Sequence, residues 1–182
     1  MSAKVYPKSS IREKTRDQIT EDKIRKGAIT YPVSLACVNF QSDGNLGYLI
    51  RSAACFGAEE VLVIGSVPDY RTLRQLSCGT ASWMTIKSFR NPSEYLAYTR
   101  ENDVQVISLE LTDDSINIMD YEFPKDRKIS ILTGNESYGV PAEIIMNSDC
   151  LYIPNPGYGA CMNTAQAANV ALYEYVRQIM RG

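Results

Sequence analysis

Residues 128–145 read KISILTGNESYGVPAEII, and residues 150–175 read CLYIPNPGYGACMNTAQAANVALYEY. In each stretch a short apolar run of strand type leads into a glycine-bearing turn, and the turn leads into a helical pattern. Ligands bind at the carboxyl ends of strands in open α/β sheets, and glycine there lets a ligand approach the backbone closely. The turns 134–139 and 154–163 are therefore the first candidates for a functional site.

The rest of the chain alternates strands and helices in the same way. Apolar runs predict strands at 33–39, 60–65, 84–88, 104–109, 128–133 and 151–153. Helical spacing and stop signals predict helices at 45–57, 69–77, from 91 or 93, from 141 to 147, and from 161 to the end. This alternation predicts an α/β fold with a mostly parallel sheet flanked by helices.

A basic arm precedes this body. Residues 1–30 contain eight Lys or Arg and four Asp or Glu, whereas residues 31–182 contain 11 and 17. A capping-box pattern from Ser10 to Glu13, and Gly27 as a stop, predict a helix in the arm. A basic arm on an acidic body is typical of nucleic-acid binding; a solvated helix face is an equally good interpretation of the charge alone.

Residue usage excludes several classes of protein. The chain has no histidine, and its five cysteines never form a CxxC pair. This argues against a metal site or a disulfide framework and favours a reducing, cytoplasmic compartment. No apolar run approaches the roughly 18 residues of a membrane span, and the first ten residues lack the apolar core of a secretory signal.

Known nucleotide motifs fit poorly. Gly157 to Met162 is a near miss to GxGxxG, but methionine replaces the third glycine and no strand follows to carry the ribose-binding acid. A P-loop pattern is missing. Glu136 in the first turn would repel a phosphate, and it suits a cationic ligand or a hydroxyl donor instead.

Three motifs carry a more specific resemblance. They read Asn45-x-Gly47-x-x-x-Arg51-x-Ala53-x-x-Phe56-Gly57, Thr133-Gly134-Asn135-Glu136-x-x-Gly139-Val140 and Ile153-Pro154-x-x-Gly157-x-x-x-Cys161-Met162-Asn163. In this order they resemble the motifs of the SPOUT superfamily of RNA methyltransferases, in its SpoU-type (TrmH-like) branch, over about residues 33 to 180. The chain departs from the family at Cys161-Met162-Asn163, where Ser-Leu-Asn is usual, which puts the role of the serine hydroxyl in doubt.

The resemblance implies a fold, a reaction and partners. It implies a C-terminal deep trefoil knot, a homodimer, and a domain at 31–182 behind the arm at 1–30. It implies transfer of a methyl group from S-adenosylmethionine to a ribose 2′-hydroxyl of tRNA or rRNA, with S-adenosylhomocysteine as product and no metal. Two rival functions stay open: a catalytically silent RNA-binding relative, suggested by Cys161, and an unrelated nucleotide-binding α/β enzyme.

The resemblance also implies site residues. The cofactor would contact Thr133, Gly134, Asn135, Ile153, Pro154, Gly157, Met162 and Asn163. The catalytic set would be Arg51, Asn45, Glu136, Asn163 and Cys161. Because guanidinium stays protonated, Arg51 would act as a phosphate clamp and alkoxide stabiliser, and a phosphate oxygen, water or Glu136 would take the proton.

Each of these residues also has a purely structural interpretation. Asn45 and Asn163 are good helix caps. Glu136 could serve only backbone donors, and Arg51 could pair with a surface acid.

Overall fold

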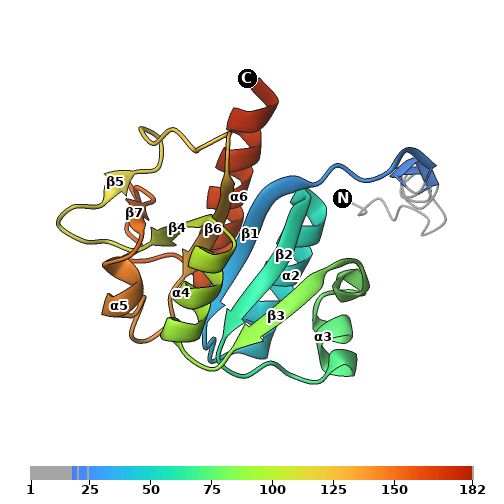
Figure 1. The fold of residues 1–182 in the computed structure, drawn as a ribbon, viewed down its shortest axis with the longest axis horizontal. Helices are drawn as coiled ribbons and strands as arrows, with labels where there is room; N and C mark the ends of the chain where they lie inside the picture. The colour runs from blue at the N-terminus through green and yellow to red at the C-terminus, as the bar shows by residue number, and fades with distance from the viewer. Residues whose placement is uncertain (1–17, 20, 24, 182) are drawn as a thin grey trace, which may run out of the picture.

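The fold is built around β1 (Tyr31–Val38), which pairs with β2 (Ala58–Ile64) on one side and β6 (Lys128–Thr133) on the other. The computed structural model describes residues 18, 19, 21–23 and 25–181. Its sheet has seven strands in the order β3-β2-β1-β6-β4-β7-β5, and all pairs are parallel (Figure 1). The remaining strands are β3 (Thr85–Phe89), β4 (Val104–Leu109), β5 (Ile116–Asn117) and β7 (Asp149–Tyr152).

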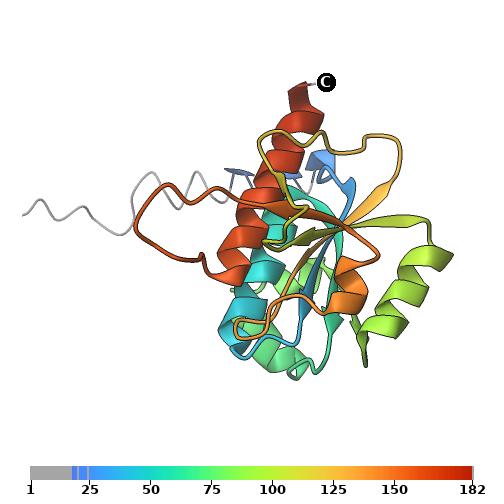
Figure 2. The same cartoon turned by 90° about the vertical axis from the view of Figure 1, so that its left-hand side faces the viewer.

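Helices cover both faces of the sheet, as the edge-on view of Figure 2 shows. One face carries α2 (Asp43–Phe56), α3 (Tyr70–Leu76) and the long α6 (Thr164–Arg181). The other face carries α4 (Pro92–Glu101) and the short α5 (Ala142–Ile145). The central strands are buried on both faces, which explains why β1 and β6 are nearly continuous apolar runs.

Local sequence signals set the helix ends. Gly57 ends α2 in the left-handed region at φ +74°, where a side chain would collide with the carbonyl oxygen of Ile29. Asp69 caps α3 by accepting from the amide of Thr72, and Asn91 caps α4. Helices α2 and α6 pack against each other on the sheet, so the first motif, on α2, lies close to the last motif, which leads into α6.

Most predicted elements are confirmed, with corrections at their ends. The last helix begins at Thr164 and not at Cys161, because the side chain of Asn163 caps it and holds the preceding residues outside the helix. The strand predicted at 151–153 is β7 and spans 149–152. A further two-residue strand, β5, pairs with it at the edge of the sheet. The short 3-10 helix Thr80–Trp83 was not expected from the sequence either.

The arm is described in part. Residues 18, 19, 21–23, 25 and 26 are helical and exposed, and Gly27 has φ +81°, as expected of a stop. The capping box at 10–13 lies outside the described residues. Among the described helices, none is long and apolar enough to cross a membrane.

Candidate active site

The predicted motifs meet at the carboxyl edge of the sheet. Strands β1, β6, β4 and β7 are consecutive neighbours, and the register pairs Leu109 with both Thr133 and Leu151. The segments that follow these strands therefore leave the sheet side by side. Parallel order thus brings the turn after β6 and the segment after β7 to one edge, next to the start of α2.

The turn after β6 is rigid. Asn135 and Gly139 exchange two backbone hydrogen bonds of 3.0 Å. A side chain on Gly134 would overlap the backbone of Gly139 and Val140, so glycine is required there. The Glu110 carboxylate, directly after β4, accepts from the amide of Val140 at 2.9 Å and supports the turn from its other side.

Glu136 joins this turn to the loop between β1 and α2. Its carboxylate accepts from the Gln41 amide at 2.8 Å, the Asn45 side chain at 2.6 Å and, at 3.5 Å, the Ser42 amide. Partial burial alone would raise the pKa of Glu136, but these hydrogen bonds outweigh it and hold the pKa below its ordinary value. The carboxylate is therefore ionised at neutral pH, and its lone pairs are largely occupied.

A line of side-chain amides connects all three motifs. The Asn163 Oδ1 accepts from the amides of Ala165 and Gln166, so its Nδ2 is left to donate, and it bonds Asn45 Oδ1 at 3.0 Å. The Asn45 Nδ2 consequently faces Glu136. Capping of α6 thus fixes the direction of the whole line Asn163–Asn45–Glu136, and the cap interpretation of Asn163 is compatible with a place in the site.

Arg51 lines the same hollow as Asn45 and Asn163. A hollow of about 580 Å³ lies between α2 and α6, and Asn45, Tyr48, Arg51 and Asn163 are part of its wall. Arg51 is exposed, and its Nη1 lies 3.6 Å from Cys78 Sγ. Within the described residues no carboxylate forms a salt bridge with Arg51, and no hydrogen bond joins it to either asparagine.

The predicted cofactor residues differ in what they leave free. The Thr133 hydroxyl and the Asn135 side-chain amide donate to the carbonyl groups of Ala36 and Asn39, so both side chains are committed within the protein. Ile153, Pro154 and Met162 are half-buried.

Gly157 and Cys161 are exposed, and no hydrogen bond connects Cys161 to another described residue. The structure therefore brings Asn45, Glu136, Asn163 and Arg51 together, but it does not place Cys161 in contact with them.

Sequence reasoning missed Glu110 and Gln41, which fix the turn and the β1–α2 loop. An acid directly after a predicted strand was the available signal for Glu110. The carboxylates of Glu110 and Glu136 lie on either side of the turn, and residues 134–140 contain no Lys or Arg. This chemistry suits a cationic ligand better than a phosphate.

Comparisons with known proteins point to one family of RNA methylases. The model of the SpoU rRNA methylase family matches residues 32–173. The chain is 34% identical over 144 residues to mouse tRNA (guanosine(18)-2′-O)-methyltransferase TARBP1, which covers 76% of this chain and 9% of that protein. It is 27% identical over 135 residues to the Escherichia coli K12 tRNA (guanosine(18)-2′-O)-methyltransferase, covering 74% of this chain and 58% of that one. The chain thus spans only part of these relatives.

Solved structures give the same picture. The crystal structure of an AdoMet-bound rRNA methyltransferase from Sinorhizobium meliloti superposes with a TM-score of 0.72 at 26% identity, over 81% of this chain and 56% of that one. The TrmH/SpoU tRNA modifying enzyme of A. aeolicus gives a TM-score of 0.75 over 91% of this chain and 84% of its own, at 18% identity, which supports the fold alone.

Proposed function

Because this chain belongs to the SpoU rRNA methylase family, we propose that it transfers a methyl group from S-adenosylmethionine to a ribose 2′-hydroxyl of tRNA or rRNA. The line Asn163–Asn45–Glu136 carries the proposal, since it joins the three motif segments beside the hollow that Arg51 lines. Family membership sets aside the unrelated nucleotide-binding enzyme. It also implies the C-terminal trefoil knot.

Arg51 is proposed to bind the phosphate next to the target ribose and to stabilise the developing alkoxide. Its exposed guanidinium, without a carboxylate partner among the described residues, is available to an anion. A fixed guanidinium matches the two-pronged geometry of a phosphate. Stabilisation of charge that develops during the reaction is worth about 10² or more in rate.

Glu136 is proposed to position Asn45 and not to take the proton. A carboxylate whose pKa lies below its ordinary value is a weak base. Its two oxygens already accept from Asn45 and from backbone amides. The proton of the ribose hydroxyl would then pass to a phosphate oxygen or to water, while Asn45 and Asn163 line the space in which the ribose lies.

The residues at the carboxyl edge fit S-adenosylmethionine, which when bound supplies an electrophilic methyl group on a positively charged sulfur. The carboxylates of Glu110 and Glu136 flank the turn that would meet this cation. We propose that the backbone at Gly134 and the half-buried side chains of Ile153 and Met162 hold the cofactor.

Single-turnover methyl transfer to unmodified tRNA and rRNA transcripts tests the proposal. We expect wild type to methylate one of them, and Arg51→Ala to lose about 10²-fold or more in rate while calorimetric S-adenosylmethionine binding is kept. Arg51→Lys should recover little, because an ammonium lacks the guanidinium fork. Arg100→Ala, on α4 across the sheet, is the matched control. RNA binding without any transfer by wild type would favour the silent relative.

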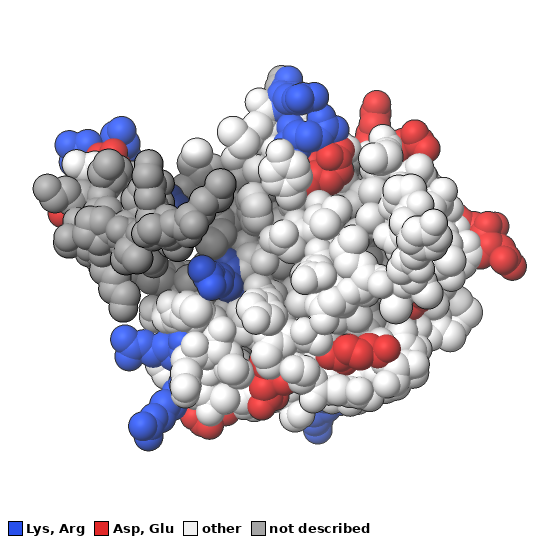
Figure 3. Space-filling model, turned by 180° about the vertical axis from the view of Figure 1, so that it is seen from behind, with Lys and Arg blue, Asp and Glu red and all other residues white. Residues whose placement is uncertain are grey.

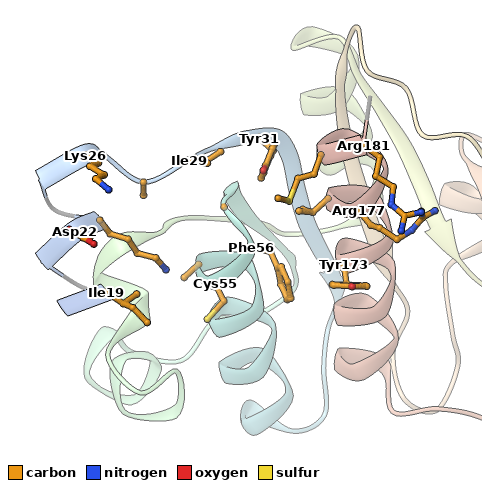
Figure 4. Close-up of a pocket in the computed structure, with 17 residues that line it drawn as sticks. Ile19, Asp22, Lys26, Ile29, Tyr31, Cys55, Phe56, Tyr173, Arg177 and Arg181 are labelled. Atoms are coloured by element: carbon orange, nitrogen blue, oxygen red, sulfur yellow. The ribbon is translucent and has the colours of Figure 1, made fainter. Parts of the chain in front are cut away.

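A second copy of the chain is the proposed protein partner. A hollow of about 860 Å³ lies between the arm, the end of α2 and α6 (Figure 4), and Ile29, Tyr173 and Met180 on its wall are exposed apolar side chains. Met180→Asp should raise the dimer dissociation constant in analytical ultracentrifugation. Met119→Asp, at an equally exposed methionine away from this hollow, should not. A wild-type monomer at micromolar concentration would contradict the dimer.

The division into an arm at 1–30 and a catalytic body at 31–182, and a cytoplasmic location, complete the proposal. The described arm residues are exposed, which supports a separate role for them. None of the five cysteines forms a disulfide, which is compatible with a reducing compartment.

A further inference from the structure

Two arginines on α3 line a third hollow. Arg71, Arg74 and Gln75 form it together with Cys78 and Gly79, and its volume is about 440 Å³. The side chains of Arg71 and Arg74 are exposed, and no carboxylate in the described part of the chain forms a salt bridge with them. Several other cations do pair with acids: Arg25, Lys87, Arg90, Arg127, Lys128 and Arg177.

This α3 hollow adjoins, through one contact, the hollow lined by Asn45, Arg51 and Asn163, which we call the active-site hollow. Cys78 is part of its wall, and Cys78 Sγ lies 3.6 Å from Arg51 Nη1, whose side chain forms part of the wall of the active-site hollow. Arg51 therefore stands between the two. A chain that occupied the active-site hollow and continued past Arg51 toward Cys78 would reach the hollow that Arg71 and Arg74 line.

The position of α3 is rigid. A side chain on Gly47 of α2 would overlap Leu76, so the two helices touch through a glycine. Leu73 is buried in the core, and the amide of Gly79 returns to the carbonyl of Arg74 at 2.7 Å to close the helix. The nearby Asp69 is occupied with the amide and hydroxyl of Thr72. The arginines are thus held beside Arg51 with their guanidinium groups uncommitted.

We propose that the α3 hollow binds backbone phosphates of the RNA strand that flank the nucleotide in the active-site hollow, an inference that rests on the proposed function. Guanidinium forks match phosphate oxygens bidentately, and phosphate contacts set the register of a nucleic acid without reading its sequence. On the face that Figure 3 shows, Lys and Arg side chains lie mostly toward the left edge, which carries the arm and α3, and at the top, whereas acidic side chains predominate toward the right edge. In a chain of net charge −2, this surface is where a polyanion is attracted.

The test is the salt dependence of RNA binding by an Arg71→Gln/Arg74→Gln double variant. The probe is a fluorescein-labelled unmodified tRNA transcript followed by anisotropy. Loss of two phosphate contacts should lower the slope of log affinity against log salt by about 1.4 to 1.8, and weaken binding about tenfold or more at low salt. Calorimetric S-adenosylmethionine binding should not change, because the hollow is separate from the turns after β6 and β7.

The matched control removes the same charge elsewhere. Arg100→Gln/Arg127→Gln changes two arginines that share a hollow across the sheet, so the net charge is the same as in the α3 variant. We expect the control to keep the wild-type slope. Methyl transfer by the α3 variant should need more RNA for half-maximal rate while its rate at saturating RNA is kept, as expected for lost uniform binding.

The outcomes separate this inference from the proposed function. An unchanged slope, or an equal fall in the control, overturns the inference and leaves methyl transfer standing. A fall confined to the α3 variant, in a protein that binds RNA without methylating it, supports the inference and overturns the proposed activity. A wild type that binds no transcript overturns both.

Discussion

Asn45→Asp isolates the link between the first and second motifs. In the wild type, Asn163 Nδ2 donates to Asn45 Oδ1 at 3.0 Å, and the carboxylate introduced at position 45 can still accept this hydrogen bond. It loses only the Nδ2 that donates to Glu136 Oε1 at 2.6 Å, and it sets two carboxylates against each other. We therefore expect the change to destabilise the fold through Glu136 alone.

The size of the effect has two parts. A hydrogen bond to a charged group contributes about 1.5–3 kcal/mol. Repulsion between two unit charges about 4 Å apart near a protein surface is about 4 kcal/mol, but Glu136 is open to water, which screens much of it. We expect the free energy of unfolding to fall by about 2–4 kcal/mol near neutral pH, a large part of the about 5–15 kcal/mol of a typical domain.

The contribution of the Glu136 site to the free energy of unfolding should depend on pH with the opposite sign in the variant. In the wild type the pKa of Glu136 is lowered on folding, so its contribution to stability is present above the unfolded pKa and is lost as the pH falls. In the variant, either Glu136 or the carboxyl introduced at position 45 takes a raised pKa, because two close carboxylates resist joint ionisation. Stability of the variant relative to wild type should then increase on acidification from about pH 7 to about pH 5.

Urea unfolding at both pH values measures this. Asn102→Asp is the control, since Asn102 donates to a backbone carbonyl and not to a carboxylate. Adding Glu136→Gln restores a donor opposite the introduced carboxylate, so the double variant should be more stable than the sum of the single changes predicts, by about 1–3 kcal/mol. If Asn45→Asp costs no more than the control and shows no gain on acidification, the described line of hydrogen bonds is wrong.

Three further outcomes are expected. Gly134→Ala should lower the free energy of unfolding by about 2 kcal/mol or more in urea titrations, because its side chain would overlap the Gly139 backbone and break the paired hydrogen bonds of the turn. Deleting residues 1–30 should weaken binding of a tRNA transcript and flatten its salt slope with S-adenosylmethionine binding kept; an unchanged slope would make the arm structural. Thiol labelling of the native protein should spare Cys37, since burial raises its pKa and encloses it, and should reach the exposed Cys55, Cys78 and Cys161; rapid labelling of Cys37 would contradict its burial.

The sequence predicted those parts of the fold that depend on local pattern. The runs at β1 and β6 are buried on both faces, and only the small polar residues Ser34, Ser130 and Thr133 interrupt their apolar stretches, so they could be read as strands. The edge strand β5 has two residues, too few to show a period, and it exists only through its pairing with β7. The start of the last helix was misplaced because the helical spacing continues before Asn163, whereas the cap decides where the helix begins.

For the site, motifs predicted the residues but not their contacts. Asn45, Glu136 and Asn163 were selected, yet their common line follows from strand order and from the cap of α6. Glu110 was missed because its contact crosses from β4 to the turn after β6. The α3 arginines were missed because their place beside Arg51 depends on the packing of α3 against α2.

Strand β1 also sets an order in time for a chain leaving the ribosome. Ser34 of β1 donates to the carbonyl of Ile129, which is made 95 residues later. Asn45 accepts from Asn163, which is made 118 residues later. At roughly 5–20 residues per second, β1, β2 and β3 are exposed for several seconds with one side of β1 unpaired. An edge of that kind is a template for aggregation, so the N-terminal half of the nascent chain needs protection until β6 is made and pairs with β1.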